Sequence, residues 1–327
     1  MAIARRESNE PSPMRIALLG AGLTRNWGGW LATELVGELC GRIKDPEILR
    51  RLKLQRNFEL VLAELRQEAN RGADEQRRFG ELEAAVLAAF GEMNTVLSTQ
   101  RFEINSDPSH WLVNFFGEFD AIFSLNQDLL LELHYVPGKT DQEHRRWRTT
   151  TYPGLQVPFD WDDYLPHARL PIVLTESGDT FSATDVQPIY KLHGSVNWRT
   201  AGGTPILVIG GSKDATIRGS TLLSSYLDEF NRCLHAGQTK LMVIGYSFQD
   251  EHINGVIQRA SDGAGLQTYL VNPAGLSIFD GPPEALIFAP KEVFKSLRLS
   301  GVLTRPFRDA FAGDHLAFNS IWRFLRP

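Results

Sequence analysis

Apolar residues follow two kinds of pattern along this chain, and each pattern predicts a different element. Short continuous apolar runs bounded by glycine or polar residues are typical of strands buried on both faces, as in a parallel sheet. Five runs fit this description: 14–19, 119–125, 189–192, 240–246 and 268–271. Stretches with helical spacing of apolar residues separate the runs. Strands that alternate with helices predict an α/β fold of Rossmann type, with three layers around a parallel sheet.

The chain between the first two strands, at about 34–115, is helical in pattern. Charged residues separate two sets of apolar positions that recur at helical spacing. The sets are Phe58, Val61, Leu62, Leu65 and Ala69, then Leu82, Val86, Ala89, Met93 and Leu97. A further helix, at about 42–54, carries the mixed charges of a solvated face. We therefore expect an inserted helical small lobe, with a site in the cleft between this lobe and the sheet.

The same patterns divide the chain into regions. Residues 14–290 are expected to form one α/β domain, preceded by a polar, flexible N-terminal tail at 1–13. The region at about 135–187 is rich in Pro, Thr, Asp and aromatic residues, which predicts a long irregular insertion. Such an insertion is either a binding surface or a packed excursion of the chain. Residues 291–327 predict a C-terminal helical segment that packs on the core or on a partner.

Composition narrows the functional classes. The 327 residues carry a formal net charge of −5, so no general basic field favours direct sequence-specific binding of nucleic acid. An arginine cluster at 145–148 leaves open a local contact with a partner or a nucleic acid. The sequence has no apolar run of 18 residues and no signal peptide, because residues 1–13 are polar. We expect a cytoplasmic protein with no membrane contact.

The first candidate site is the glycine turn Gly20-Ala21-Gly22, which follows the first strand and precedes Thr24. Glycines let the main chain approach a phosphate group, and a helix that starts there offers unpaired N–H groups. The dehydrogenase pattern GxGxxG is not met, because Arg25 stands in place of its third glycine. The turn therefore predicts a nucleotide-phosphate site without hydride transfer. A tight turn of any α/β protein is an equally good interpretation of this segment alone.

Two strand ends carry side chains suited to catalysis. Asn126 and Asp128 follow the second strand, where an open parallel sheet binds its ligands. Both residue types are also common in turns and helix caps. His193 follows the next strand and precedes a glycine. An imidazole titrates near neutrality, so it can accept a proton from a hydroxyl or a water molecule with little tuning.

The two remaining strand ends complete the set of candidates. Gly245 and Ser247 lie at the end of the strand 240–246, and Asn272 follows the strand 268–271. Asp250 and Glu251 follow Ser247 by three and four residues and are interpreted as the acidic residues of a helix start, where they favour the helix dipole.

Taken together and in this order, these segments resemble the NAD-binding core of the sirtuin-like family, in the bacterial branch whose members hydrolyse NAD. The glycine turn with Thr24 matches the family's Gly-Ala-Gly-hydrophobic-Ser/Thr turn. Residues 124–128 resemble its Thr-x-Asn-x-Asp motif, with Ser124 in place of the threonine, and residues 192–194 resemble its Leu-His-Gly motif.

The resemblance implies a role for each candidate. It makes Asn126 and His193 the catalytic residues, with Asn126 positioning the ribose and a water molecule and His193 acting as base. It also implies a set of NAD-binding residues, which are Gly20, Ala21, Gly22, Thr24, Asn126, Asp128, Gly245, Ser247 and Asn272. Among these, Asp128 would support the nicotinamide pocket.

Cysteine content separates two activities within the family. Sirtuin deacylases hold a structural zinc ion with four cysteines, and this chain has only Cys40 and Cys233. The resemblance therefore implies NAD as substrate, no zinc, and cleavage of the nicotinamide N-glycosidic bond to nicotinamide and ADP-ribose. Two alternatives stay open. One is an NAD-dependent protein deacylase or ADP-ribosyltransferase, and the other is a non-catalytic nucleotide-sensing assembly subunit.

The resemblance also suggests how such an activity is controlled. In the bacterial branch these domains commonly act as effectors in anti-phage defence, and no sensor domain is recognisable in this chain. We therefore expect a homo-oligomer that is weakly active alone. A separately encoded activator, such as a HerA-like ATPase or a short Argonaute, would switch it on.

Overall fold

The computed structural model describes residues 13–135, 146–156, 172–174, 185–200, 202–210, 213–280 and 289–326. Its centre is a sheet of seven parallel strands in the order β11-β10-β9-β1-β2-β6-β3. The strands are β1 (Arg15–Leu19), β2 (Ala121–Ser124), β3 (Thr149–Thr151), β6 (Val186–Lys191), β9 (Lys240–Ile244), β10 (Gln267–Val271) and β11 (Arg298–Leu303). The six strands from β6 to β11 have the strand order of the doubly wound nucleotide-binding folds. In those folds the ligand binds in a crevice where the strand order reverses, and here that point lies between β1 and β9.

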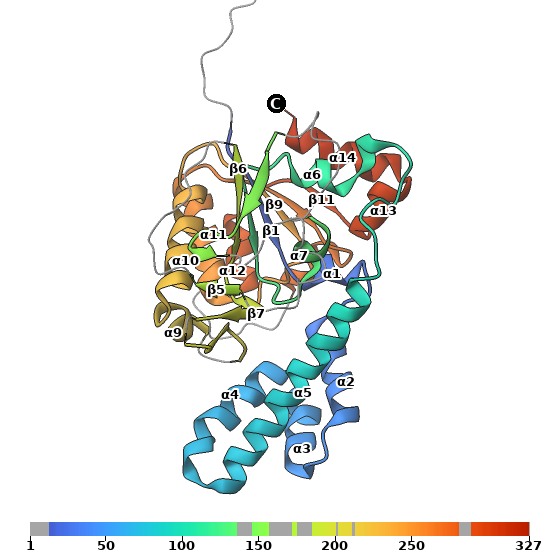
Figure 1. Ribbon diagram of the computed structural model, residues 1–327. Helices are drawn as coiled ribbons and strands as arrows, with labels where there is room; N and C mark the ends of the chain where they lie inside the picture. Colours follow the sequence, from blue (N-terminus) through green and yellow to red (C-terminus); the bar gives the residue numbers. More distant parts are fainter. Residues whose placement is uncertain are drawn as a thin grey trace, which may run out of the picture.

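Helices cover both faces of the sheet, so the domain has three layers, as the sequence predicts (Figure 1). One face carries α10 (Thr221–Leu234), α11 (Glu251–Gly263) and α12 (Pro290–Ser296); the other carries α6 (Leu112–Phe116), α13 (Phe307–Ala312) and α14 (His315–Leu325). On the second face the ring of Phe115 lies 5.4 Å from that of Phe307 and 5.1 Å from that of Phe311. Burial of such rings on both faces explains why the strands between them are apolar throughout. The Rossmann-type fold is confirmed.

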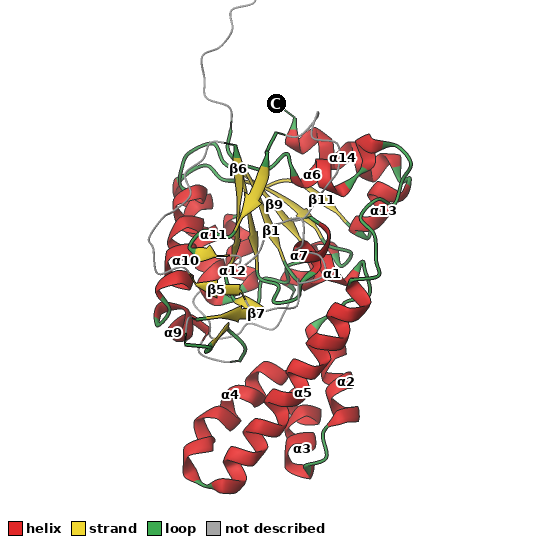
Figure 2. Cartoon of the chain, in the orientation of Figure 1, coloured by secondary structure: helices red, strands yellow, loops and turns green. Residues whose placement is uncertain are grey.

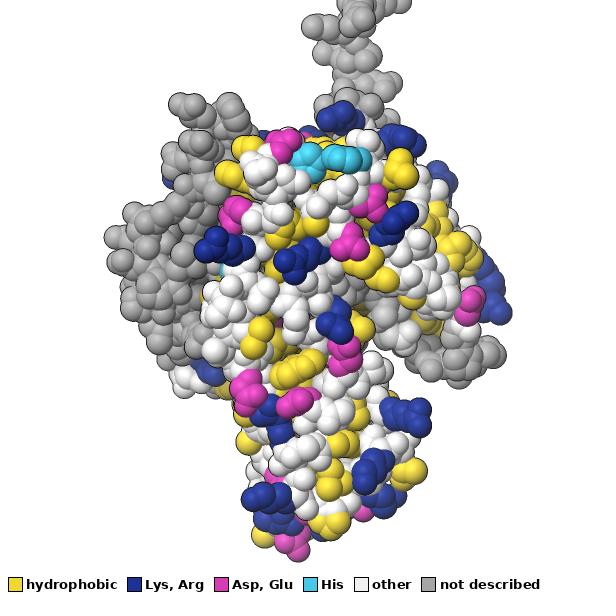
Figure 3. Space-filling model, turned by 90° about the vertical axis from the view of Figure 1, so that its right-hand side faces the viewer, with side chains coloured by type: hydrophobic (Ala, Val, Ile, Leu, Met, Phe, Trp, Pro, Cys, Tyr) yellow, Lys and Arg dark blue, Asp and Glu magenta, His cyan; other side chains and the backbone are white. Residues whose placement is uncertain are grey.

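The inserted lobe projects from the body of the protein and consists of helices, which Figure 2 shows in one colour. Its elements are α2 (Ala32–Arg42), α3 (Pro46–Gln55), α4 (Phe58–Glu68), the short 3-10 turn η1 (Ala69–Arg71) and α5 (Ala73–Leu97). Asp45 and Asn57 fix two of the helix starts by accepting hydrogen bonds from first-turn N–H groups. Figure 3 shows acidic and basic side chains interspersed over the lobe and the adjoining face of the body.

The last turns of α5 join the lobe to the sheet domain. Asn94 accepts a hydrogen bond of 2.9 Å from the N–H of Leu129, and the ring of His134 bonds to the carbonyl of Leu97 at 2.7 Å. Both partners belong to α7 (Leu130–His134) or the residue before it. The lobe is therefore anchored directly beside the segment that follows β2.

The C-terminal segment differs from its prediction, because it holds a strand as well as helices. β11 pairs with β10 at the edge of the sheet, with a register shift between Thr268 and Tyr269. Gly301 lies under the ring of Tyr269, and a Cβ atom there would be 2.5 Å from a ring carbon. A glycine in the middle of a short run hides the alternation that normally predicts a strand. The helices of this segment pack on the sheet, with Tyr269 and Phe324 5.2 Å apart.

Most of the predicted irregular insertion at 135–187, together with the tail at 1–12, lies outside the described residues. The described parts of the insertion contain β3, β4 (Leu155–Gln156) and β5 (Ile172–Leu174). With β7 (Gly194–Arg199) and β8 (Pro205–Leu207), β4 and β5 form a second sheet in the order β4-β5-β7-β8. Among the described helices, none has the length and apolar character to cross a membrane.

Candidate functional site

The candidate residues converge because five neighbouring strands end in one row. The register aligns Lys191 with Ser124, Ser124 with Leu19, Leu19 with Ile244, and Ile244 with Val271. Each candidate residue follows this row by one residue or a few. The strands are parallel, so the glycine turn, Asn126, Asp128, His193, Gly245, Ser247 and Asn272 all lie at the same edge of the sheet, at the carboxyl ends where such sheets bind ligands.

Two glycine segments pack against each other at the point where the strand order reverses. The N–H of Gly22 donates to the carbonyl of Gly245 at 2.9 Å, and a Cβ atom on Gly22 would lie 2.6 Å from the Cα of Gly245. Gly245 itself has φ +67° and would collide with the turn if it carried a side chain. The helix that begins within the turn, α1 (Ala21–Arg25), is five residues long. The glycines thus bring the backbones of β1 and β9 together, and the exposed Ala21 lies at the open edge.

A chain of hydrogen bonds links Asn126, Thr24 and Asp128. The amide of Asn126 donates to the carbonyl of Gly20 and to Thr24 Oγ1, both at 3.0 Å, and Thr24 Oγ1 donates to Asp128 Oδ2 at 2.8 Å. The carbonyl of Gly20 can only accept, which fixes the orientation of the amide. Both amide hydrogens are used in these bonds. A bound molecule would therefore meet the carbonyl oxygen of Asn126.

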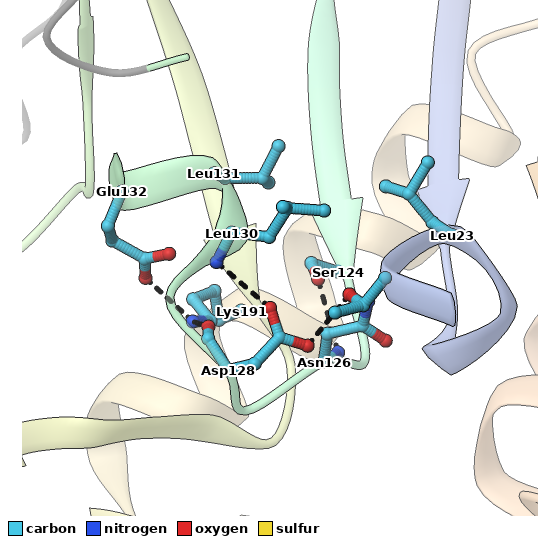
Figure 4. A pocket seen from close by; sticks show the side chains of 9 residues that line it. Leu23, Ser124, Asn126, Asp128, Leu130, Leu131, Glu132 and Lys191 are labelled. Atoms are coloured by element: carbon cyan, nitrogen blue, oxygen red, sulfur yellow. Dashed lines mark hydrogen bonds and ion pairs between the residues drawn. The ribbon is translucent and has the colours of Figure 1, made fainter. Parts of the chain in front are cut away.

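A small pocket lies directly over this chain of hydrogen bonds (Figure 4). It is lined by Leu23, Thr24, Ser124, Asn126, Asp128, Leu130, Leu131, Glu132 and Lys191. The space open to the centre of a water molecule is about 10 Å³, close to what a single water needs. A nicotinamide ring does not fit this space. The pocket brings together three predicted residues, Thr24, Asn126 and Asp128, whereas the other candidates lie outside its lining.

The floor of the pocket contains a buried ion pair that the sequence interpretation missed. The ammonium of Lys191 contacts Glu132 Oε1 at 2.6 Å, the carbonyl of Asp128 at 2.6 Å and the hydroxyl of Ser195 at 2.8 Å. Lys191 and Glu132 are almost fully buried, and Glu132 Oε2 has no hydrogen-bond partner among the described residues. The sequence does hold a signal, since each charged residue interrupts an apolar run, one in β6 and one in α7.

His193 lies just beyond β6, with its ring buried against that of His252. The two Nε2 atoms are 3.1 Å apart, and His193 also donates a hydrogen bond to the backbone of Leu125. Because Nε2 faces His252, the donor to Leu125 is Nδ1, which makes Nε2 the acceptor of a neutral ring. Burial lowers the pKa of His193 to about 3, helped by the nearby positive charge of Lys213 and opposed by Asp250. At neutral pH the ring is therefore neutral, and in this buried state it is a weaker base than a free imidazole.

An ion-pair bridge connects this histidine pair to the lobe. Lys213, in α9 (Lys213–Arg218), contacts Asp250 Oδ1 at 2.7 Å and Glu59 Oε2 at 2.8 Å. Glu59 lies in α4 of the lobe. Asp250 does occupy the N-cap position of α11, yet its carboxylate makes no capping bond and is paired with Lys213 instead. The interpretation of Asp250 as a simple helix-start residue was therefore incomplete.

The two remaining candidates lie at the rim of the same edge. Asn272 donates to the carbonyl of Tyr246 at 3.3 Å and accepts from the N–H of Ala274 at 3.0 Å, so it joins the ends of β9 and β10. Ser247 is exposed on the segment between them. Both are placed where they can reach a ligand that extends from the glycine turn along the sheet edge.

Comparison with known proteins adds one finding to this geometry. No curated protein matches the chain. The SIR2-like domain matches residues 120–287, just over half of the chain, from the start of β2 to the segment after β10. The match includes Asn126, Asp128, His193, Ser247 and Asn272, and it excludes the glycine turn and the lobe. The chain therefore belongs to the SIR2-like family, which is a family of NAD-dependent enzymes.

Proposed function

We propose that the protein hydrolyses the nicotinamide N-glycosidic bond of NAD. One observation carries the proposal: Asn126 and His193 follow adjacent parallel strands by the same two residues, at the edge of the sheet that also carries the glycine pair of β1 and β9. A nucleotide laid along this edge has its phosphates at the glycines and a ribose between the amide and the imidazole. Family membership supports NAD as that nucleotide.

The chemistry asks for positioning and charge stabilisation more than for covalent help. The bond between ribose C1′ and the nicotinamide nitrogen breaks, its electron pair leaves with neutral nicotinamide, and an oxocarbenium-like ribose develops. A water molecule then adds its oxygen to C1′. The carbonyl oxygen of Asn126 is suited to orient this water. His193 would take its proton at Nε2, for which the neutral ring is the required form.

The remaining candidates would hold the rest of the nucleotide. The backbone of Gly20, Ala21 and Gly22 would bind the phosphates, and Ser247 and Asn272 would bind the adenosine side; all of them follow strands that end in the same row. Asp128, bonded to Thr24, would support the nicotinamide end. No step in this scheme asks for a metal ion.

We infer that the site must open before it can turn over. Its pocket accommodates about one water molecule, and Leu23, Leu130 and Leu131 form its apolar wall. The described exposed large hydrophobic residues lie mostly on or beside the lobe; those of the lobe region are Leu31, Leu54, Leu60, Leu87 and Val96. These features support control by a partner that binds the lobe. The resemblance adds the rest of the proposal, which is an oligomeric effector of anti-phage defence that is activated by a HerA-like ATPase or a short Argonaute.

The test is separation of products after incubation with NAD, using the chain alone and the chain mixed with each candidate activator. We expect nicotinamide and ADP-ribose, with faster turnover in an activated mixture. His193→Ala and Asn126→Ala should each lower turnover by roughly 10²-fold or more, the usual scale for losing a general base or a positioned water.

The matched control is His235→Ala, which removes an exposed histidine at the end of α10. Its turnover should equal that of the wild type. Circular dichroism would establish that all variants fold. Folded catalytic variants with near wild-type turnover would refute the assigned roles, and release of nicotinamide only in the presence of an acylated peptide would favour the deacylase instead.

A further inference from the structure

We propose that His193, His252 and Asp250 form a binding site for a divalent transition metal ion, with zinc as the best fit. The site differs in kind from the four-cysteine zinc module of the deacylases, because its donors are two imidazoles and one carboxylate. A bound ion would compete with the proton that His193 accepts. That regulatory consequence rests on the proposed function, whereas the binding itself does not.

The geometry is close to that of a ligated ion. The donor atoms of the three residues all lie within 4.8 Å of one another, and the two Nε2 atoms are 3.1 Å apart. Tetrahedral zinc with bonds of about 2.0–2.1 Å holds two nitrogen ligands at about 3.4 Å from each other. The two rings therefore need to separate by only a few tenths of an ångström. A third ligand within reach leaves the fourth position open to water.

The surroundings of His193 also fit a metal ligand. Its Nδ1 donates to the backbone carbonyl of Leu125, and ligating histidines commonly use their second nitrogen in this way, which fixes the ring and directs Nε2 toward the ion. The ring is buried just beyond β6, an inner strand of the sheet, and Asp250 and His252 lie at the start of α11. All three ligands therefore lie at the ends of regular elements of the sheet domain.

The charges around the three residues favour a cation. Asp250 and Glu59 supply two negative charges, and Lys213 between them supplies one positive charge, which leaves a net negative charge beside two neutral rings. Lys213 contacts Oδ1 of Asp250 at 2.7 Å, and a carboxylate has a second oxygen that can bind an ion while this contact is kept. Two imidazoles and one carboxylate with an open fourth position form a donor set that zinc accepts readily.

A bound ion would inhibit hydrolysis. The lone pair of His193 Nε2 can either accept a proton or bind the metal. Zinc at micromolar concentrations would then lower NAD turnover, and removal of zinc by a chelator would restore it. An enzyme that needs its metal responds in the opposite way, because the chelator lowers its turnover.

Binding is tested by calorimetric titration of zinc chloride into chelator-treated protein, followed by cobalt(II) absorption spectroscopy, which reports tetrahedral coordination. We expect one ion per chain. His252→Ala and Asp250→Asn should each weaken binding by at least about tenfold, the scale expected when an ion loses a ligand or its support. His252→Gln is a second variant in case the alanine variant does not fold.

His235→Ala, which removes a histidine remote from the three ligands, should bind zinc as the wild type does. No binding, or binding that is unchanged in both ligand variants, would overturn the proposal. The ratio of NAD turnover with and without zinc is then measured for the wild type and for His252→Ala, and only the wild type should show inhibition. If zinc binds as described and no preparation releases nicotinamide, the site stands and the proposed function fails.

Discussion

Replacement of Lys191 by methionine should destabilise the fold far more than loss of an ordinary ion pair. The side chain of Lys191 is 1% exposed and that of its partner Glu132 is 0% exposed. Removal of the ammonium leaves the carboxylate without a counter-charge and deprives the Asp128 carbonyl and the Ser195 hydroxyl of a donor. Loss of one partner of such a pair costs about 3–5 kcal/mol. Methionine fills nearly the same volume, so little of the loss comes from a cavity.

The double variant Lys191→Met/Glu132→Met tests whether the cause is the unpaired charge. Removal of both charged groups leaves two apolar side chains in an apolar environment, and such replacements are often neutral or stabilising. The double variant should therefore be more stable than Lys191→Met alone. With Glu132→Met as the second single variant, the double-mutant cycle gives the coupling free energy of the pair, which is the effect of the double variant minus the sum of the two single effects.

Urea unfolding followed by circular dichroism measures all of these free energies. The matched control is Lys295→Met, because Lys295 and Glu292 pair at nearly the same distance, 2.7 Å against 2.6 Å, with side chains 62% and 45% exposed. An exposed pair contributes about 0–1 kcal/mol. A Lys191→Met loss no larger than that of the control would refute the assignment of this pair as a buried and desolvated one.

Two further predictions concern the glycine turn and the response to pH. Gly22→Ala should lower the free energy of unfolding by about 1–3 kcal/mol, because its Cβ would lie 2.6 Å from Gly245. Gly37→Ala, with nothing within 4 Å in helix α2, should instead raise it by about 0.5–1 kcal/mol in the same denaturation assay, and equal effects would contradict the close packing. Burial lowers the pKa of His193 from 6.5 to about 3, so between these pH values the ring is protonated in the unfolded chain and neutral in the folded one. Stability should fall as the pH drops from 6.5 toward 3, and unfolding measured at pH 7 and pH 5 should show a smaller fall for His193→Asn.

Local sequence patterns were sufficient to predict the sheet and the edge that bears the candidate site. Continuous apolar runs identify β1, β2, β9 and β10, and the polar residues that follow them, such as Asn126 and Asn272, then occupy one edge because the strands are parallel. Helical spacing also predicts the lobe. These features depend on residues that are near one another in the chain, and the spacing of apolar residues predicts such local structure.

Features that depend on distant partners could not be predicted in this way. Lys191 and Glu132 are 59 residues apart, and so are His193 and His252. The local sequence around one member of each pair does not indicate which distant residue it contacts. β11 is recognisable only through its pairing with β10, because Gly301 breaks its pattern to make room for Tyr269. In each case the decisive contact forms only after the sheet has fixed the register of its strands.

Among the described residues, two attachments of the lobe lie next to the site, so a movement of the lobe can change the site. One is the bond from Leu129 to Asn94 in α5, beside the pocket wall, and the other is the bridge from Glu59 through Lys213 to Asp250, beside the histidine pair. With 25 residues, α5 is about 37 Å long, so the far end of the lobe is remote from the strand ends. A protein bound at that far end touches no catalytic residue, yet any tilt it imposes changes both attachments. Linkage is reciprocal. If the bound protein changes the affinity of the site for a nucleotide by some factor, the nucleotide must change the affinity of the lobe for that protein by the same factor.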